Sequence, residues 1–168
     1  TAHCLRAQRG PRVVGLTSNE EARVARALGY RGRIVRLRSA TLEEIADGLV
    51  YDIEELTGNP AHALAAAAIA GRSGRRLDVH FALNSTGMGR NGLDLTHPGG
   101  RSAAKALMAI KGLRIVGIMS HFPVEDVADM APALERFRTE SDWVIEAGGL
   151  DRTQIVRHVA NSYATLNL

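Results

Sequence analysis

Regular alternation of short apolar runs with amphipathic segments is the feature of this sequence that most restricts its fold. Six runs have the length and composition of β-strands, and five segments with helical spacing of apolar residues lie between them. The strand-like runs are residues 13–16, 34–37, 51–56, 77–83, 113–119 and 155–159. Because a parallel neighbour is reached only through a crossover, usually a helix, the alternation predicts an α/β protein with a parallel sheet.

Capping patterns indicate where three of the helices begin. They are Ser18 with Glu21, Thr41 with Glu44, and Asn59 followed by Pro60. The third of these helices is rich in alanine and is predicted to run to residue 70, with Gly71 ending it. A further helix is predicted over residues 102–111.

Two architectures have a parallel sheet of this kind, and the residues after the strands decide between them. A doubly wound sheet usually carries a glycine-rich phosphate loop after its first strand, and residues 15–18 do not form one. Polar residues instead follow strand after strand, as they do in a (β/α)8 TIM barrel. Such a barrel takes about 250 residues. This chain has 168, so we expect one incomplete barrel domain over residues 1–168, with about six of the eight units.

Composition excludes several classes of partner and site. The net charge is only +3 and the arginines are spread along the chain, so no basic stripe predicts nucleic-acid binding. No apolar run approaches the roughly 20 residues that cross a membrane. Cys4 is the only cysteine, which excludes an internal disulfide and a cysteine-built metal site, and no metal is predicted. Only two lysines, Lys105 and Lys111, occur in the sequence.

Three segments that follow predicted strands carry candidate functional groups. The turn 87–92 places Arg90 among glycines, which allow close approach of a ligand, and its guanidinium suits a carboxylate or a phenolate-like oxygen. The alternative is a solvated arginine on a surface loop. His121 lies at a strand mouth, where a packed structural histidine is the alternative. Residues 158–162 suit a phosphate, and equally an ordinary helix N-cap.

These segments resemble those of a known family. "STGMGRNGL", "GIMSHFPVED" and "HVANSYATL" resemble, in order, three motifs of the alanine racemase barrel domain. "NSTGMGRNGL" and "HFPVED" are similar to the branch of broad-specificity amino-acid racemases. The resemblance implies a fold-type III barrel that binds pyridoxal 5′-phosphate (PLP), with the visible strands as the second to the seventh. It also implies racemisation, in which the Cα proton of an amino acid is removed and returned on the other face.

The resemblance also implies a role for each matching residue. Arg90 lies beside the substrate carboxylate and the cofactor ring oxygen, and His121 and His158 lie by the cofactor ring and its nitrogen. Asn161 and Ser162 match positions at the phosphate. Where many alanine racemases carry a carbamylated lysine this chain has Leu83, and Asn91 fits a bound anion instead.

Departures from the family pattern bear on activity. The Schiff-base lysine of the first strand has no counterpart, because Lys105 and Lys111 fall on or after a helix and are predicted to be solvated. The tyrosine base of the C-terminal β-domain and the eighth strand have no counterpart either. We therefore expect an internal segment of a racemase that is inactive alone. Two alternatives remain open: a non-catalytic PLP-binding barrel involved in PLP homeostasis, and, with little support, an unrelated phosphate-binding barrel enzyme.

The resemblance implies further properties of the intact enzyme. It would be a bacterial homodimer that acts on a small amino acid. The compartment stays open between periplasm and cytoplasm, and the broad-specificity pattern at Leu83 and Asn91 slightly favours the periplasm.

Overall fold

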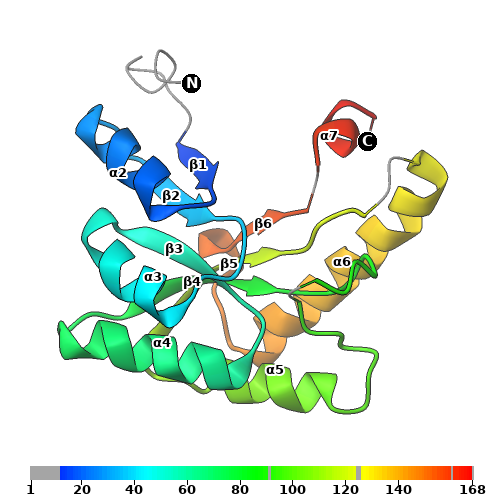
Figure 1. Ribbon diagram of the computed structural model, residues 1–168. Helices are drawn as coiled ribbons and strands as arrows, with labels where there is room; N and C mark the ends of the chain where they lie inside the picture. Colours follow the sequence, from blue (N-terminus) through cyan, green and yellow to red (C-terminus); the bar gives the residue numbers. More distant parts are fainter. Residues whose placement is uncertain (1–11, 91, 124–125, 160, 168) are drawn as a thin grey trace.

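The six predicted strands form one parallel sheet in which each strand pairs with its neighbour in sequence. A computed structural model describes residues 12–90, 92–123, 126–159 and 161–167 (Figure 1). The strands are β1 (Val13–Leu16), β2 (Arg33–Arg36), β3 (Ile53–Thr57), β4 (Leu77–Ala82), β5 (Leu113–Met119) and β6 (Val156–His158). Their order is β1-β2-β3-β4-β5-β6, without the reversal of a doubly wound sheet. The predicted fold class, a partial (β/α)8 barrel, is confirmed.

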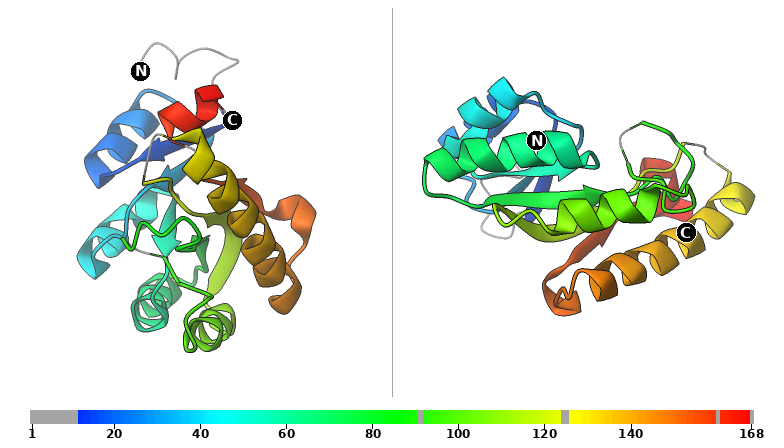
Figure 2. Two further views of the ribbon diagram at one scale, coloured as in Figure 1. Left: turned by 90° about the vertical axis from the view of Figure 1, so that its right-hand side faces the viewer. Right: turned by 90° about the horizontal axis from the view of Figure 1, so that it is seen from below.

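Helices cover the outer face of this curved sheet, as the end-on view in Figure 2 shows. They are α2 (Asn19–Ala27), α3 (Leu42–Gly48), α4 (Pro60–Arg72), α5 (Gly100–Met108), α6 (Val127–Ala147) and α7 (Ser162–Asn167), with short 3-10 helices η1 (Leu49–Tyr51) and η2 (Arg152–Gln154). The first five of the α-helices connect consecutive strands, as predicted. Among the residues that the structure describes, no helix is long and apolar enough to cross a membrane.

The predicted helix starts are present with their side-chain caps. Ser18 accepts a hydrogen bond from the Glu21 amide while Glu21 accepts one from the Ser18 amide, which completes a capping box. Thr41 and Glu44 form the same pair of bonds at α3. Asn59 caps α4, which begins with proline.

Two of the wrongly predicted boundaries each depend on the backbone conformation of a single residue. The helix α4 continues through Gly71 to Arg72, because the left-handed conformation that follows its end falls at Gly74, with φ +68°. The third strand begins at Ile53 and not at residue 51, because Asp52 adopts φ 51° and ends η1 there. The helix α5 also begins two residues and ends three residues earlier than predicted, at Gly100–Met108.

The main apolar core lies between the outer face of the sheet and the helices. Four alanines of α4 are buried in it, and their small side chains let the helix approach β4, where Val79 and Phe81 are buried. On the opposite, inner face the apolar cluster is small and consists of Leu56, Ala82 and Met119. Side chains alternate along a strand, so the residues between the outward-facing ones point inward, where several of them are polar.

The loop after β4 returns along its own strand before α5 begins. The Leu93 amide donates to the Ala82 carbonyl at 2.9 Å, and the Asn84 amide donates to the Leu93 carbonyl at 2.8 Å. Gly92 lies so close to this strand that an added Cβ would be 2.3 Å from the carbonyl carbon of Leu83. The absence of a side chain at position 92 therefore sets the path of the loop.

We predict that Gly92→Ala lowers the free energy of unfolding by about 1–3 kcal/mol, since rigid backbone atoms must move to admit the methyl group. Chemical denaturation measures the change. Gly71→Ala is the matched control, because Gly71 is exposed inside α4 with nothing within 4 Å of its added Cβ. It should stabilise the chain by about 0.5–1 kcal/mol. Equal effects of the two substitutions would contradict the role given to Gly92.

Candidate functional site

The predicted site residues follow three adjacent strands at their carboxyl ends. Arg90 lies in the loop after β4, His121 is the second residue after β5, and His158 is the last residue of β6. Asn161 and Ser162 come next along the chain, at the start of α7. Because the strands are parallel and adjacent, their carboxyl ends meet at one edge of the sheet, which faces the viewer in the left panel of Figure 2.

The turn that carries Arg90 uses its glycines as the sequence suggests. Gly87 and Gly89 have φ +77° and +67°, a region that side chains disfavour. The side chain of Asn84 accepts a hydrogen bond from the Gly89 amide at 2.7 Å and closes the turn. Within the described residues Arg90 is exposed and makes no hydrogen bond or ion pair, so its guanidinium is free to meet an anion.

Hydrogen bonds join the segment of His121 to the loops on either side. The Thr86 hydroxyl donates to the His121 carbonyl at 2.5 Å, from the loop after β4. The Asn161 amide group donates to the Phe122 carbonyl at 3.5 Å, from the segment after β6. The three predicted segments therefore form one connected surface.

Arg90 and His121 also interact electrostatically. Burial lowers the pKa of the His121 imidazole, and the positive charge of Arg90 lowers it further. Both effects disfavour the imidazolium. The site therefore presents a fixed cation beside an imidazole that is neutral at neutral pH.

Asn161 acts as a helix cap, the alternative that the sequence left open for this segment. Its Oδ1 accepts a hydrogen bond from the Ala164 amide at 2.8 Å. Ser162 is exposed at the first position of α7. Contact of Asn161 and Ser162 with a phosphate stays a prediction, and Asn91, predicted to meet an anion, lies outside the described residues.

His158 differs from the other site residues because its ring is hydrogen-bonded to a side chain in the barrel interior. Its Nε2 lies 2.7 Å from His80 Nδ1, and His80 Nε2 lies 2.7 Å from Glu54 Oε2. Sequence reasoning missed His80 and Glu54. The signal was an ionisable residue in the middle of each strand-like run, Glu54 in "IEELT" and His80 in "LDVHFA".

The two lysines lie away from this edge, as predicted. Lys105 is exposed on α5, and Lys111 is exposed just before β5, at the amino end of that strand. Leu83 is buried in the core against the helices. No group of three His, Cys, Asp or Glu side chains suited to a metal ion occurs in the part of the chain that the structure describes.

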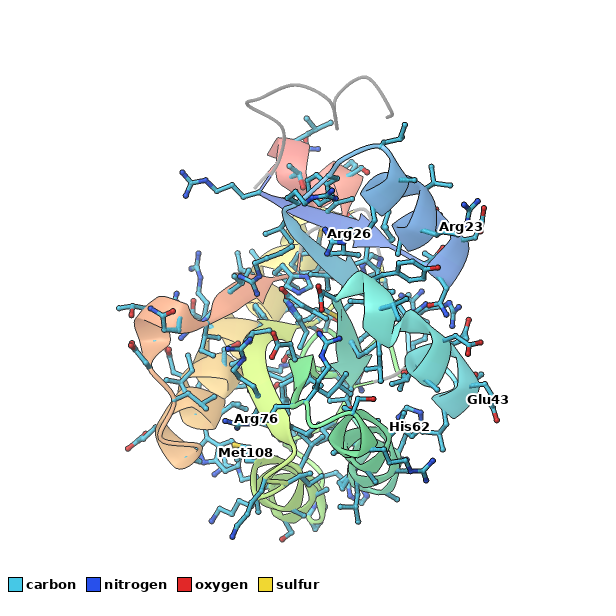
Figure 3. All side chains as sticks on the ribbon, turned by 90° about the vertical axis from the view of Figure 1, so that its left-hand side faces the viewer. Arg23, Arg26, Glu43, His62, Arg76 and Met108 are labelled. Carbon is cyan, nitrogen blue, oxygen red and sulfur yellow. The ribbon has the colours of Figure 1, made fainter. Side chains whose placement is uncertain are left out.

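Two hollows open at opposite ends of the sheet. One of about 590 Å³ lies at the carboxyl ends of β2, β3 and β4 and is lined by Arg90, Asn84 and His62, among others. The larger, of about 940 Å³, lies at the amino ends, and Figure 3 labels two of its lining residues, Arg26 and Arg76. Functional groups of such barrels gather at the carboxyl ends, so we assign the site there.

Comparison with known proteins identifies the family of the chain. The family described as "Alanine racemase, N-terminal domain" matches residues 1–168. The chain belongs to the alanine racemase family. It is 48% identical over 155 residues to a broad-specificity amino-acid racemase of Aeromonas hydrophila and 47% identical to one of Pseudomonas putida, covering 92% of this chain and 38% of each relative.

A solved structure supports the fold of this member of the alanine racemase family. Alanine racemase of Clostridium difficile 630 superposes with a TM-score of 0.83 at 20% identity, over 97% of this chain and 44% of that one. The chain thus spans well under half the length of the curated relatives it matches. The resemblance found in the sequence motifs, including that to the broad-specificity racemases, is confirmed.

The neutral His158 makes stability depend on pH. Burial and the neighbouring His80 lower the pKa of His158 to about 4, whereas an unfolded histidine titrates near 6.5. As the pH falls from about 6.5 to 4, the unfolded chain therefore binds a proton that the folded chain does not. We predict that the free energy of unfolding falls by about 2–3 kcal/mol across this window.

Urea denaturation at several pH values measures this slope. His158→Asn should remove most of it, and part of what remains belongs to His121, whose pKa is also lowered. Glu54, with a pKa lowered from 4.5, adds a loss of stability that begins as the pH falls below about 4.5. His97→Asn, at an exposed position, is the control and should keep the slope. An unchanged slope in His158→Asn would show that another group is responsible.

Proposed function

We propose that this chain is the cofactor-binding part of a PLP-dependent amino-acid racemase. The observation that carries the proposal is the free guanidinium of Arg90 beside the neutral ring of His121, at the carboxyl edge of an alanine racemase-type barrel. A cation and neutral donors at one edge suit a ligand with anionic groups at both ends, as PLP has. The donor set therefore fits the cofactor that the family implies.

When bound, PLP supplies an electron sink for the charge that forms at Cα as the proton leaves. The residues of this chain bind and orient the cofactor and the substrate. Arg90 holds the substrate carboxylate and the ring oxygen through its planar fork of donors. His121 would lie by the ring and would add no second positive charge there, because burial and Arg90 keep it neutral. Ser162, with Asn161, binds the phosphate, and Asn91 binds an anion near Arg90.

Racemisation also needs two acid–base groups, one on each face of Cα, to remove the proton and to return it. We place neither group in this chain. Lys105 lies on the helix α5 and Lys111 lies at the amino end of the sheet, away from the carboxyl ends of the strands. We propose that the lysine and the tyrosine base lie in other parts of the intact racemase. The intact enzyme acts on amino acids as a homodimer, and the broad-specificity pattern favours export to the periplasm.

We predict that the chain binds PLP weakly, and that Arg90→Gln raises the dissociation constant about tenfold, because a charge-assisted contact is lost. Titration with PLP followed by equilibrium dialysis measures binding. Arg138→Gln is the matched control: it removes the same charge from an exposed position of α6 and should leave binding unchanged. Equal binding by both variants would place the PLP site elsewhere.

We also predict no racemase activity for the chain alone, because each missing proton-transfer group contributes a factor of about 100 or more. Chiral chromatography of L-amino acids incubated with the chain and PLP should detect no D-isomer. Borohydride reduction and peptide mass spectrometry should find no stoichiometric pyridoxyl group on Lys105 or Lys111. Turnover, or a specific label on either lysine, would overturn the placement of the bases outside this chain.

A further inference from the structure

A line of four polar side chains crosses the inner face of the sheet from β2 to β6. Arg33 on β2 donates two hydrogen bonds to Glu54 on β3, at 2.6 and 2.8 Å. Glu54 meets His80 on β4 at 2.7 Å, and His80 meets His158 on β6 at 2.7 Å. His158 is the only one of the four at the carboxyl edge, so the line joins the candidate site to the barrel interior.

The last contact of the line passes over β5 without touching a side chain of it. β5 pairs with both β4 and β6, and Gly117 is the residue of β5 opposite His80. A Cβ at Gly117 would lie 2.2 Å from His80 Nδ1 and 2.4 Å from its Cε1. The missing side chain lets the rings of His80 and His158 meet edge to face, with centroids 4.8 Å apart.

The carboxylate of Glu54, between Arg33 and His80, determines where the protons of the line lie. Burial opposes ionisation of Glu54, but the hydrogen bonds from His80 and Arg33 outweigh it and lower its pKa, so the carboxylate can only accept. His80 must then carry its proton on Nε2, which leaves Nδ1 as an acceptor. His158 must in turn carry its proton on Nε2, which leaves its own Nδ1 with a lone pair.

A doubly protonated His80 is the competing arrangement, and charge disfavours it. Glu54 already has a cationic partner in Arg33, so a cationic His80, which is completely buried, would be a second positive charge on one carboxylate. His158 cannot carry the charge either, because burial keeps it neutral. The neutral arrangement satisfies every ring nitrogen of the pair except His158 Nδ1.

We propose that Glu54 and His80 are positioning residues that hold His158 as the neutral Nε2–H tautomer, so that Nδ1 serves the site as a hydrogen-bond acceptor. The two nitrogens of an imidazole point apart, so Nδ1 faces away from His80. An acceptor at this place selects an N–H or O–H donor and repels carboxylate and phosphate oxygens. The phosphate of the proposed cofactor therefore lies toward Ser162 and not against His158.

The tautomer can be read directly, and only its use at the site rests on the proposed function. Long-range ¹H–¹⁵N NMR of the chain with ¹⁵N-labelled histidine, at neutral pH and without PLP, should show protonated Nε2 and unprotonated Nδ1 for both His80 and His158. His80→Phe keeps a ring in place but removes the acceptor, and His158 should then become a mixture of tautomers. Gly117→Ala should do the same by displacing the His80 ring. His97→Gln is the control and should leave both signals unchanged.

Three results would overturn the proposal: His158 protonated on Nδ1, a cationic His80 at neutral pH, or a single unchanged tautomer of His158 in His80→Phe. The wild-type spectrum decides the first two even if the variants fold poorly. Since no cofactor is present, failure of the chain to bind PLP would end the proposed function and leave the tautomer result intact. If PLP does bind, His80→Phe should weaken binding several-fold while His80→Gln, which keeps one donor and one acceptor, restores it.

Discussion

Parallel pairing of each strand with its neighbour in sequence is the constraint on which the rest of this structure depends. It sends every connection over the outer face as a helix and brings every carboxyl end to one edge. Arg90, His121 and Ser162 lie far apart along the chain and share that edge for this reason alone. The same pairing places the inward side chains of β2 to β6 in a row, which is what lets a polar line cross four strands.

The two faces of the sheet meet different energetic demands. The outer face buries apolar side chains and the small residues of α4, and this burial is the main source of stability. The inner face places an ionised carboxylate and two imidazoles in a largely dry space, which is unfavourable unless every polar atom finds a partner. Arg33, Glu54, His80 and His158 meet that condition by bonding in series, except at His158 Nδ1, which lies at the end of the series at the carboxyl edge. Their tautomers follow from that series of bonds.

Much of the fold was predictable because its signals are local. Capping boxes at Ser18 and Thr41 and apolar periodicity fixed the number and order of elements without reference to the rest of the chain. The boundaries near Gly71 and Asp52 were predicted wrongly because each depends on which residue adopts the left-handed conformation. Several neighbouring residues could have adopted it. The edge positions of Arg90 and His121 were predictable because both residues lie in the segments that follow predicted strands. The roles of Glu54 and His80 were not predictable, because their contacts depend on the register of the strands and on the missing side chain at Gly117.

Arginines show why a residue type alone does not identify a site. Arg36 is almost completely buried and donates two hydrogen bonds to Glu55 and one to Asn19, so its charge is already paired within the fold. Arg33 is likewise bound to Glu54. Arg90 stands on a glycine turn at the carboxyl edge, and no carboxylate in the described chain neutralises it. A fixed charge that the fold leaves unpaired beside a neutral ring is ready for an anion at little cost in reorganisation, and this separates Arg90 from the structural arginines.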